Sequence, residues 1–144
     1  MADLSHRTAI KRRSPSLPLQ WLVRKGLVSQ FHLDYGCGRG DDADYLGCDR
    51  YDPHYFPDKP KGKYLSITCI YVLNVIEDKG ERTRVIAKVS DLLLSGGKAY
   101  FAVRRDIKKD GKTSRGTYQC NVKLSKLKLL QETAKFAIYE LTRV

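Results

Sequence analysis

One run, residues 32–42, constrains this chain of 144 residues more than any other. An apolar lead-in is followed by glycines at every second position, Gly36, Gly38 and Gly40, and then by acidic residues. Glycine populates positive φ angles without the steric cost of a Cβ atom, so closely spaced glycines favour a tight turn. The pattern predicts a buried strand that ends in a glycine loop and opens into a helix. A sharp turn without a ligand is the alternative interpretation of these glycines.

The acidic residues determine which ligand such a loop can accept. A dinucleotide fingerprint requires a third glycine where this chain has Asp41, and it directs a helix N-terminus at a pyrophosphate. Asp41 and Asp42 would repel that anion, and the glycine run is not followed by the Gly-Lys-Ser/Thr of a P-loop; the Gly-Lys-Thr at residues 111–113 lacks the P-loop's earlier glycine, because residue 106 is Asp. A glycine loop with carboxylates around it instead suits a cationic ligand that approaches the backbone closely. S-adenosylmethionine (SAM), with a sulfonium, an ammonium and no phosphate, is such a ligand.

Residues 33–40, Leu-Asp-Tyr-Gly-Cys-Gly-Arg-Gly, resemble the first motif of the class I SAM-dependent methyltransferases. Asp52 falls where that family keeps an acidic residue at the end of its second strand. Residues 67–76 are similar to the family's fourth strand and the start of the next helix. The similarity spans residues 30–105. The whole chain is also similar to short methyltransferase-like proteins of phages and bacteria, some of them linked to DNA phosphorothioation clusters.

The resemblance and the alternation of predicted strands with helices imply an α/β fold. We expect a Rossmann-like class I methyltransferase sandwich, with a mostly parallel sheet and an antiparallel C-terminal edge. Only residues 53–63 fill the place of the family's third strand and its helix, so this region should be reduced. We expect a single domain, residues 15–144, after a basic arm, residues 1–14. The expected strands are residues 29–35, 48–52, 64–71, 98–103, 116–123 and 135–142, and the expected helices are 16–26, 40–46, 78–95 and 125–133.

The resemblance also implies which residues hold the cofactor. Asp52 is expected to accept hydrogen bonds from both ribose hydroxyls, because a carboxylate has acceptor lone pairs on two oxygens. Asp49 is the alternative for this role. The expected cofactor-binding residues are Asp34, Gly36, Cys37, Gly38, Gly40, Asp52, Pro53, Cys69 and Ile70.

The methyl-accepting side is less well defined by the sequence. Residues after the strand at 64–71 face the transferred methyl in this fold, so Tyr71 and Asn74 are catalytic candidates that orient the acceptor; a structural role is the alternative. The Asp/Asn/Ser-Pro-Pro-Tyr/Phe motif is absent, which argues against the usual adenine-N6 or cytosine-N4 chemistry. The family's adenine contacts after its third strand have no counterpart. The chain from His54 to Phe56 either stacks on the adenine or caps the sheet edge.

Charge is distributed unevenly in this basic protein, which has a net charge of +11 and a pI near 9.6. Residues 34–58 carry a net charge of −5, which leaves +16 on the rest. This arrangement suits a cationic cofactor beside an anionic substrate such as DNA or RNA; alternatively, the acids are ordinary turn and helix N-terminal residues. Arg104 and Arg105 are candidate substrate-binding residues, because guanidinium groups suit phosphate. They begin a basic rim, for which a solvated face is the alternative: Arg104, Arg105, Lys108, Lys109, Lys112, Arg115, Lys123, Lys126 and Lys128.

The remaining composition narrows the class of protein. The four cysteines form no Cys-x-x-Cys pair and no zinc pattern with the histidines, so no metal is expected and a cysteine nucleophile is disfavoured. No apolar run has the length of a membrane span, and the expected location is the cytoplasm. The sequence therefore predicts a methyltransferase that acts with SAM on a nucleic acid or another phosphate-bearing molecule. The alternatives are a non-catalytic protein of this fold that binds nucleic acid or a partner, and a SAM-consuming enzyme such as a lyase.

Overall fold

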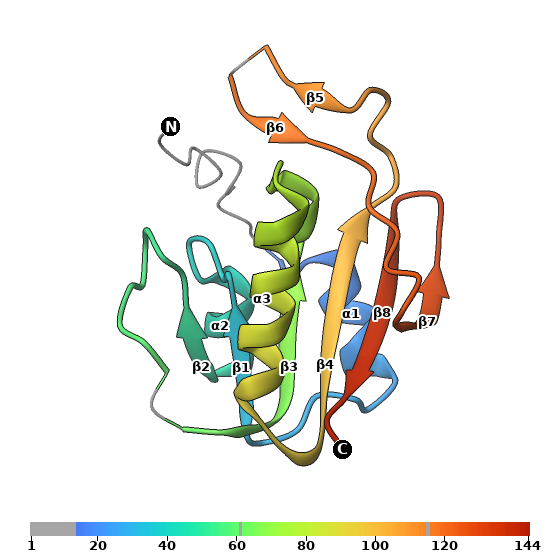
Figure 1. Cartoon of the computed structure of the whole chain (residues 1–144). Coiled ribbons are helices and arrows are strands. Elements are labelled where there is room, and N and C mark those ends of the chain that lie inside the picture. The colour runs from blue at the N-terminus through green and yellow to red at the C-terminus, as the bar shows by residue number, and fades with distance from the viewer. Residues whose placement is uncertain (1–13, 61, 115) are drawn as a thin grey trace.

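The strand predicted before the glycine loop is β1 (His32–Tyr35), which lies inside a six-stranded sheet (Figure 1). A computed structural model describes residues 14–60, 62–114 and 116–144, so the predicted basic arm falls almost entirely outside the described residues. The order across the sheet is β2 (Asp49–Tyr51), β1, β3 (Tyr64–Ile70), β4 (Leu93–Arg104), β8 (Phe136–Thr142) and β7 (Lys128–Glu132). The first four of these strands run parallel, whereas β8 and β7 continue the sheet antiparallel. This confirms the expected fold class.

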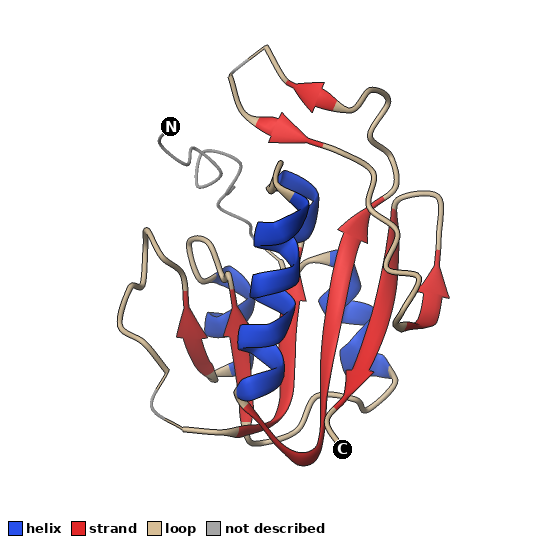
Figure 2. Ribbon diagram, in the orientation of Figure 1, coloured by secondary structure: helices blue, strands red, loops and turns tan. Residues whose placement is uncertain are grey.

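Helices cover both faces of the sheet (Figures 1 and 2). Side chains alternate along β4, because successive residues of a strand point to opposite faces. Phe101 packs in a core with Val89 of α3 (Lys79–Asp91), whereas Tyr100 packs in a second core with Leu22 of α1 (Leu17–Arg24). Trp21 packs against this second core and does not line the pocket described below.

The glycine loop leads into a helix of six residues, α2 (Asp41–Leu46), and the chain then enters β2. The described residues between β2 and β3 form neither a helix nor a further sheet strand. β2 is therefore the edge of the sheet, and the expected reduction of the third-strand region is confirmed. A tight reversal follows β2, in which the backbones of Asp52 and Phe56 bond to each other.

The C-terminal part differs from the sequence prediction in one element type. The helix predicted for 125–133 is wrong, because most of that segment is the strand β7, which pairs with β8. Leucine, lysine, glutamine and glutamate favour helices, but a helix of nine residues is marginal by itself. Pairing with β8 instead satisfies backbone groups that an exposed strand edge would leave unpaired.

Two further boundaries differ. The strand predicted at 116–123 is reduced to β6 (Tyr118–Gln119), which pairs with β5 (Gly111–Lys112) in a hairpin separate from the sheet. β4 begins before the glycines at 96 and 97 that were expected to end the preceding helix, which already ends at Asp91. A Cβ atom at Gly97 would lie 2.8 Å from the Leu94 carbonyl oxygen, so these glycines serve an irregular strand.

Candidate functional site

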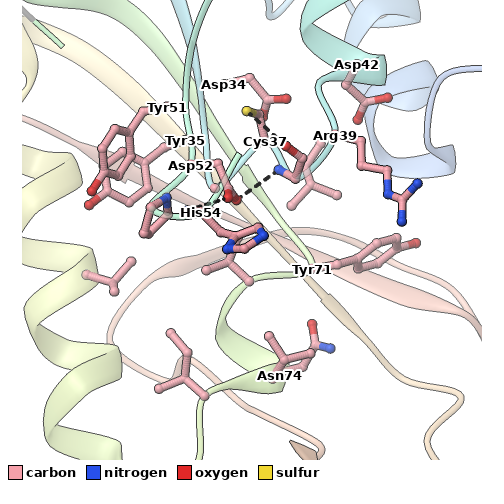
Figure 3. Close-up of a pocket in the computed structure, with 18 of the residues that line it drawn as sticks. Asp34, Tyr35, Cys37, Arg39, Asp42, Tyr51, Asp52, His54, Tyr71 and Asn74 are labelled. Atoms are coloured by element: carbon pink, nitrogen blue, oxygen red, sulfur yellow. Dashed lines mark hydrogen bonds between the residues drawn. The ribbon is translucent and has the colours of Figure 1, made fainter. Parts of the chain in front are cut away.

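A pocket of about 480 Å³ lies where the parallel strands end. Ligands of open α/β sheets bind at this edge because the loops that follow neighbouring strands converge there. Figure 3 shows side chains from the glycine loop, the turn after β2 and the segment after β3 around the pocket. The pocket brings together these predicted site residues: Asp34, Gly36, Cys37, Gly38, Asp52, Pro53, Ile70, Tyr71, Asn74 and Arg104. Gly40, Cys69 and Arg105 do not line it.

The glycine loop bends sharply and lies close to the segment after β3. Gly36 has a φ of 74°, and a Cβ atom there would lie 2.4 Å from Val72 Cγ2. The amides of Gly36 and Cys37 both donate to the carbonyl oxygen of Tyr51, at 2.7 and 3.0 Å, and the Gly38 amide donates to Asp52. These amides are occupied within the protein and do not form the free cradle that a pyrophosphate requires.

Asp52 links the glycine loop to the turn after β2. Its Oδ1 accepts the Gly38 amide at 3.1 Å, and its Oδ2 accepts the amides of His54 and Tyr55 at 3.0 and 2.9 Å. Because each carboxylate oxygen has two lone pairs, Oδ1 has one position left for a ligand. Asp49 is at the other end of β2, outside the pocket, and its Oδ2 accepts the Tyr64 hydroxyl at 2.6 Å. The geometry therefore separates the two aspartates that the sequence left as alternatives.

Asp34, in β1 just before the glycine loop, is more deeply buried than the pocket acids Asp42 and Asp52. Its carboxylate is 3% exposed and accepts the Thr68 hydroxyl at 3.1 Å. Burial, together with the charges of Asp34 and Asp52, raises the pKa of Cys37 to about 12. Burial likewise raises the pKa of Cys69, which is fully buried in the core. Both thiols are protonated at neutral pH, and neither is suited to be a nucleophile.

The segment after β3 carries strain and an unsatisfied amide. Tyr71 has a φ of 61°, the only positive φ of a non-glycine residue among residues 14–60, 62–114 and 116–144. Such backbone strain often occurs at functional sites. Asn74, in the short 3-10 helix η2 (Leu73–Val75), is 1% exposed, and neither Oδ1 nor Nδ2 has a hydrogen-bond partner. Its backbone carbonyl accepts the amide of Cys120 at 2.9 Å, so the end of the β5–β6 hairpin lies against η2.

The two candidate arginines differ in their surroundings. Arg104 lines the pocket, forms a bidentate ion pair with Asp106 at 2.8 and 2.9 Å, and lies 6.0 Å from the ring centre of Tyr71. Arg105 donates from Nη1 to the carbonyl oxygen of Thr133 and therefore contacts the turn between β7 and β8. Arg115 of the basic rim lies outside the described residues.

Several pocket residues were not singled out from the sequence. Tyr35 and Tyr51 end two neighbouring strands in register, and their ring centres are 5.0 Å apart. Both residues are the last of their strands, and this position directly before a loop could have indicated from the sequence that they line the site. Of the residues proposed to stack on adenine, His54 lines the pocket, whereas Tyr55 and Phe56 do not. Gln119 of the hairpin also lines the pocket, and no local pattern indicated it.

Comparison with known proteins identifies the fold as that of the class I SAM-dependent methyltransferases. The N-methyltransferase NodS from Bradyrhizobium japonicum WM9, solved with S-adenosylhomocysteine (SAH), has a TM-score of 0.58 at 13% identity; the match covers 88% of this chain and 84% of NodS. Magnesium protoporphyrin IX methyltransferase ChlM from Synechocystis PCC 6803 with bound SAM gives 0.52 at 17% identity, over 88% and 76%. The DhpI–SAM–HEP complex gives 0.56 at 10% identity, over 89% and 88%.

The similarity to known proteins is found by comparing structures and not by comparing sequences. No protein-family model matches the chain, and no curated protein sequence does. The narrower resemblance to phage and phosphorothioation-associated proteins stays a prediction.

In the part of the chain that the structure describes, no three His, Cys, Asp or Glu side chains are grouped so as to hold a metal ion. No described helix combines the length and apolar character of a membrane span.

Proposed function

We propose that this protein is a SAM-dependent methyltransferase that acts on a phosphate-bearing substrate, such as a nucleic acid. The observation that carries the proposal is the pocket itself. Its floor is a glycine loop whose amides at residues 36–38 are already bonded within the protein, and its walls include the carboxylates of Asp34 and Asp52. Such a site favours a cationic nucleoside without phosphates over a dinucleotide. The fold shared with solved methyltransferases supports the same ligand.

The pocket offers a distinct contact to each part of SAM. Asp52 Oδ1 has one acceptor position, so we assign it one ribose hydroxyl instead of the two expected from the sequence. Tyr35 and Tyr51, which also line the pocket, would present aromatic surface to the adenine ring. Asp34 offers a carboxylate to the cationic amino-acid end. Gly36, Cys37, Gly38, Pro53 and Ile70 shape the wall between these contacts; the roles of Gly40 and Cys69 stay predictions.

Bound SAM would supply an electrophilic methyl group, and the protein's part is to hold the acceptor in line and exclude water. We assign the acceptor contact to Asn74, whose buried amide has a donor and an acceptor without partners. Leaving such groups unsatisfied costs free energy, which a substrate with complementary groups would recover. Tyr71, which also lines the pocket and has a strained backbone, is assigned to orient the acceptor with Asn74, and we assign Arg104 of the same pocket to a substrate phosphate. Arg105 would contribute only a more distant charge.

Calorimetry with SAM and SAH tests the cofactor assignment. Wild-type protein should bind both at sub-millimolar concentration, and the absence of binding would leave the non-catalytic alternative. Transfer of a labelled methyl group to pools of DNA, RNA and small molecules then tests the reaction. Consumption of SAM without transfer to any pool would favour the lyase alternative, and transfer only to small molecules without phosphate would contradict the proposed substrate class.

A further inference from the structure

A continuous chain of buried polar side chains runs from the start of the sheet to the pocket. Ser66 Oγ lies 2.6 Å from His32 Nδ1, His32 Nε2 lies 2.9 Å from Thr68 Oγ1, and Thr68 Oγ1 lies 3.1 Å from Asp34 Oδ1. None of these four side chains is more than 3% exposed. At the far end, the amide of Ser29 donates to Ser66 Oγ at 2.9 Å. The hydrogen bonds pass between β3 and β1 three times and end at a pocket carboxylate.

The charge on Asp34 determines the direction of every hydrogen bond in this chain. A carboxylate only accepts, so Thr68 donates to Asp34 and must itself accept from His32 Nε2–H. The neutral imidazole then has an unprotonated Nδ1, to which Ser66 donates, and the Ser66 oxygen accepts the amide of Ser29. A neutral imidazole fits the surroundings, since burial lowers the pKa of His32 to about 4. Each buried donor and acceptor of the chain is thereby satisfied.

We propose that Ser66, His32 and Thr68 act as positioning residues that hold the Asp34 carboxylate in one orientation toward the pocket. The inference rests on the proposed function, because the group that Asp34 would meet is the cationic amino-acid end of SAM or SAH. A carboxylate that hydrogen bonds already hold in its binding orientation loses little conformational freedom when the cation binds. Supporting hydrogen bonds of this kind therefore increase affinity at preorganised sites. The polar chain would thus determine affinity for the amino-acid part of the cofactor and leave the adenosine part unaffected.

Two matched variants test this role. Thr68→Val removes the hydroxyl at nearly constant shape, and Thr68→Ser keeps it. The probes are SAM, SAH and 5′-methylthioadenosine, which retains the adenosine but lacks the amino-acid end. Calorimetry should show SAM and SAH affinity about tenfold lower in Thr68→Val, the loss expected for one hydrogen bond to a charged group, with 5′-methylthioadenosine within about twofold of wild type. Thr68→Ser should bind all three within about twofold of wild type.

A second pair of variants tests the same role independently, in case Thr68→Val does not fold. His32→Leu removes the donor to Thr68, whereas His32→Gln keeps an N–H group near the same place, so only His32→Leu should lose about threefold in SAM and SAH affinity. An equal loss for all three ligands in the disrupting variants, or no loss, would overturn the positioning role while leaving the proposed function intact. A wild-type protein that binds none of the ligands would overturn the proposed function and this inference with it.

Discussion

The glycine loop and the β5–β6 hairpin border the same pocket but are built in opposite ways. The loop is acidic, its amides are bonded to Tyr51 and Asp52, and its neighbour Asp42 accepts both the amide and the hydroxyl of Ser16. The hairpin is held by a two-residue ladder and by contacts at its ends, and it begins beside exposed lysines at 108 and 109. The loop is therefore held by bonds within the protein before any ligand binds, whereas under the proposed function the hairpin region would gain contacts from the larger, anionic substrate.

The largest effect should come from Asp52→Ala, which removes the acceptor that joins the loop to the turn after β2. Three backbone amides would lose their partner, so we expect the free energy of unfolding to fall by about 2–4 kcal/mol and SAH affinity to fall at least tenfold. Urea denaturation and calorimetry measure the two quantities. Asp49→Ala is the control, because its carboxylate bonds to Tyr64 outside the pocket. Equal loss of affinity in both variants would remove the distinction between the aspartates.

Gly36→Ala tests whether the loop has any freedom to move. The substitution combines a positive φ with a Cβ atom 2.4 Å from Val72 Cγ2, so we expect a loss of about 3 kcal/mol in unfolding free energy. Gly47→Ala is the matched control, since Gly47 also has a positive φ but has open space around its Cβ position; it should cost only about 1 kcal/mol. Adding Val72→Ala to Gly36→Ala should restore part of the stability in the same denaturation experiment.

The buried His32, in the row of hydrogen-bonded side chains that ends at Asp34, predicts a pH dependence of stability. Burial lowers the pKa of His32 from 6.5 to about 4, so the unfolded chain binds more protons than the folded protein between these values. The contribution is therefore complete above pH 6.5 and is lost as the pH falls toward 4, by an amount of order 3 kcal/mol. Denaturation at pH 7 and pH 4.5 should show this loss in wild type, and His32→Gln should lack most of it. Parallel pH curves for the two proteins would contradict a buried, neutral His32.

Asn74→Leu should raise stability while it removes activity. Leucine is close in size to asparagine and leaves no unsatisfied polar atoms, so we expect a gain of about 1 kcal/mol in unfolding free energy. Labelled-methyl transfer should be lost while SAH affinity stays near the wild-type value. Gln119→Leu, at a partly exposed residue of the same pocket, should leave stability unchanged. A destabilised Asn74→Leu variant would show that the amide has partners in solution.

The smallest effect should come from the basic side. The double variant Arg104→Ala, Arg105→Ala should lower the salt concentration that elutes the protein from immobilised DNA and leave SAH affinity within about twofold. Stability should change by no more than about 1 kcal/mol, because the Arg104–Asp106 ion pair is exposed to solvent. Lys98→Ala is the charge-loss control, because Lys98 lies near the middle of β4, outside the pocket, and pairs with Glu140. Unchanged elution would favour a solvated basic face.

The sequence predicted the glycine loop better than it predicted the strand β7 and the β5–β6 hairpin, and the reason is physical. Glycine spacing and the acids around it are local features, and a turn that requires positive φ at Gly36 leaves a direct mark in the chain. The strand β7 has no such local signal, because residues 128–132 are compatible with a helix as well as with a strand. They form a strand because they pair with β8. Gln119 likewise reaches the pocket through the placement of the hairpin against Asn74, which no short pattern encodes.

The amino-acid sequence alone determined an α/β sheet, a glycine loop unsuited to phosphate, and the reduced region after β2, because each depends on neighbours in the chain or on segment length. The sequence already favoured Asp52 over Asp49 for the ribose, and the tertiary structure added that Asp52 lines the pocket whereas Asp49 does not. Only the tertiary structure distinguished Arg104 from Arg105, since consecutive residues at a strand end point to opposite sides. It also revealed the chain from Ser66 through His32 and Thr68 to Asp34, whose members belong to two strands. Hydrogen bonds between strands depend on register, and register arises only when the whole sheet is assembled.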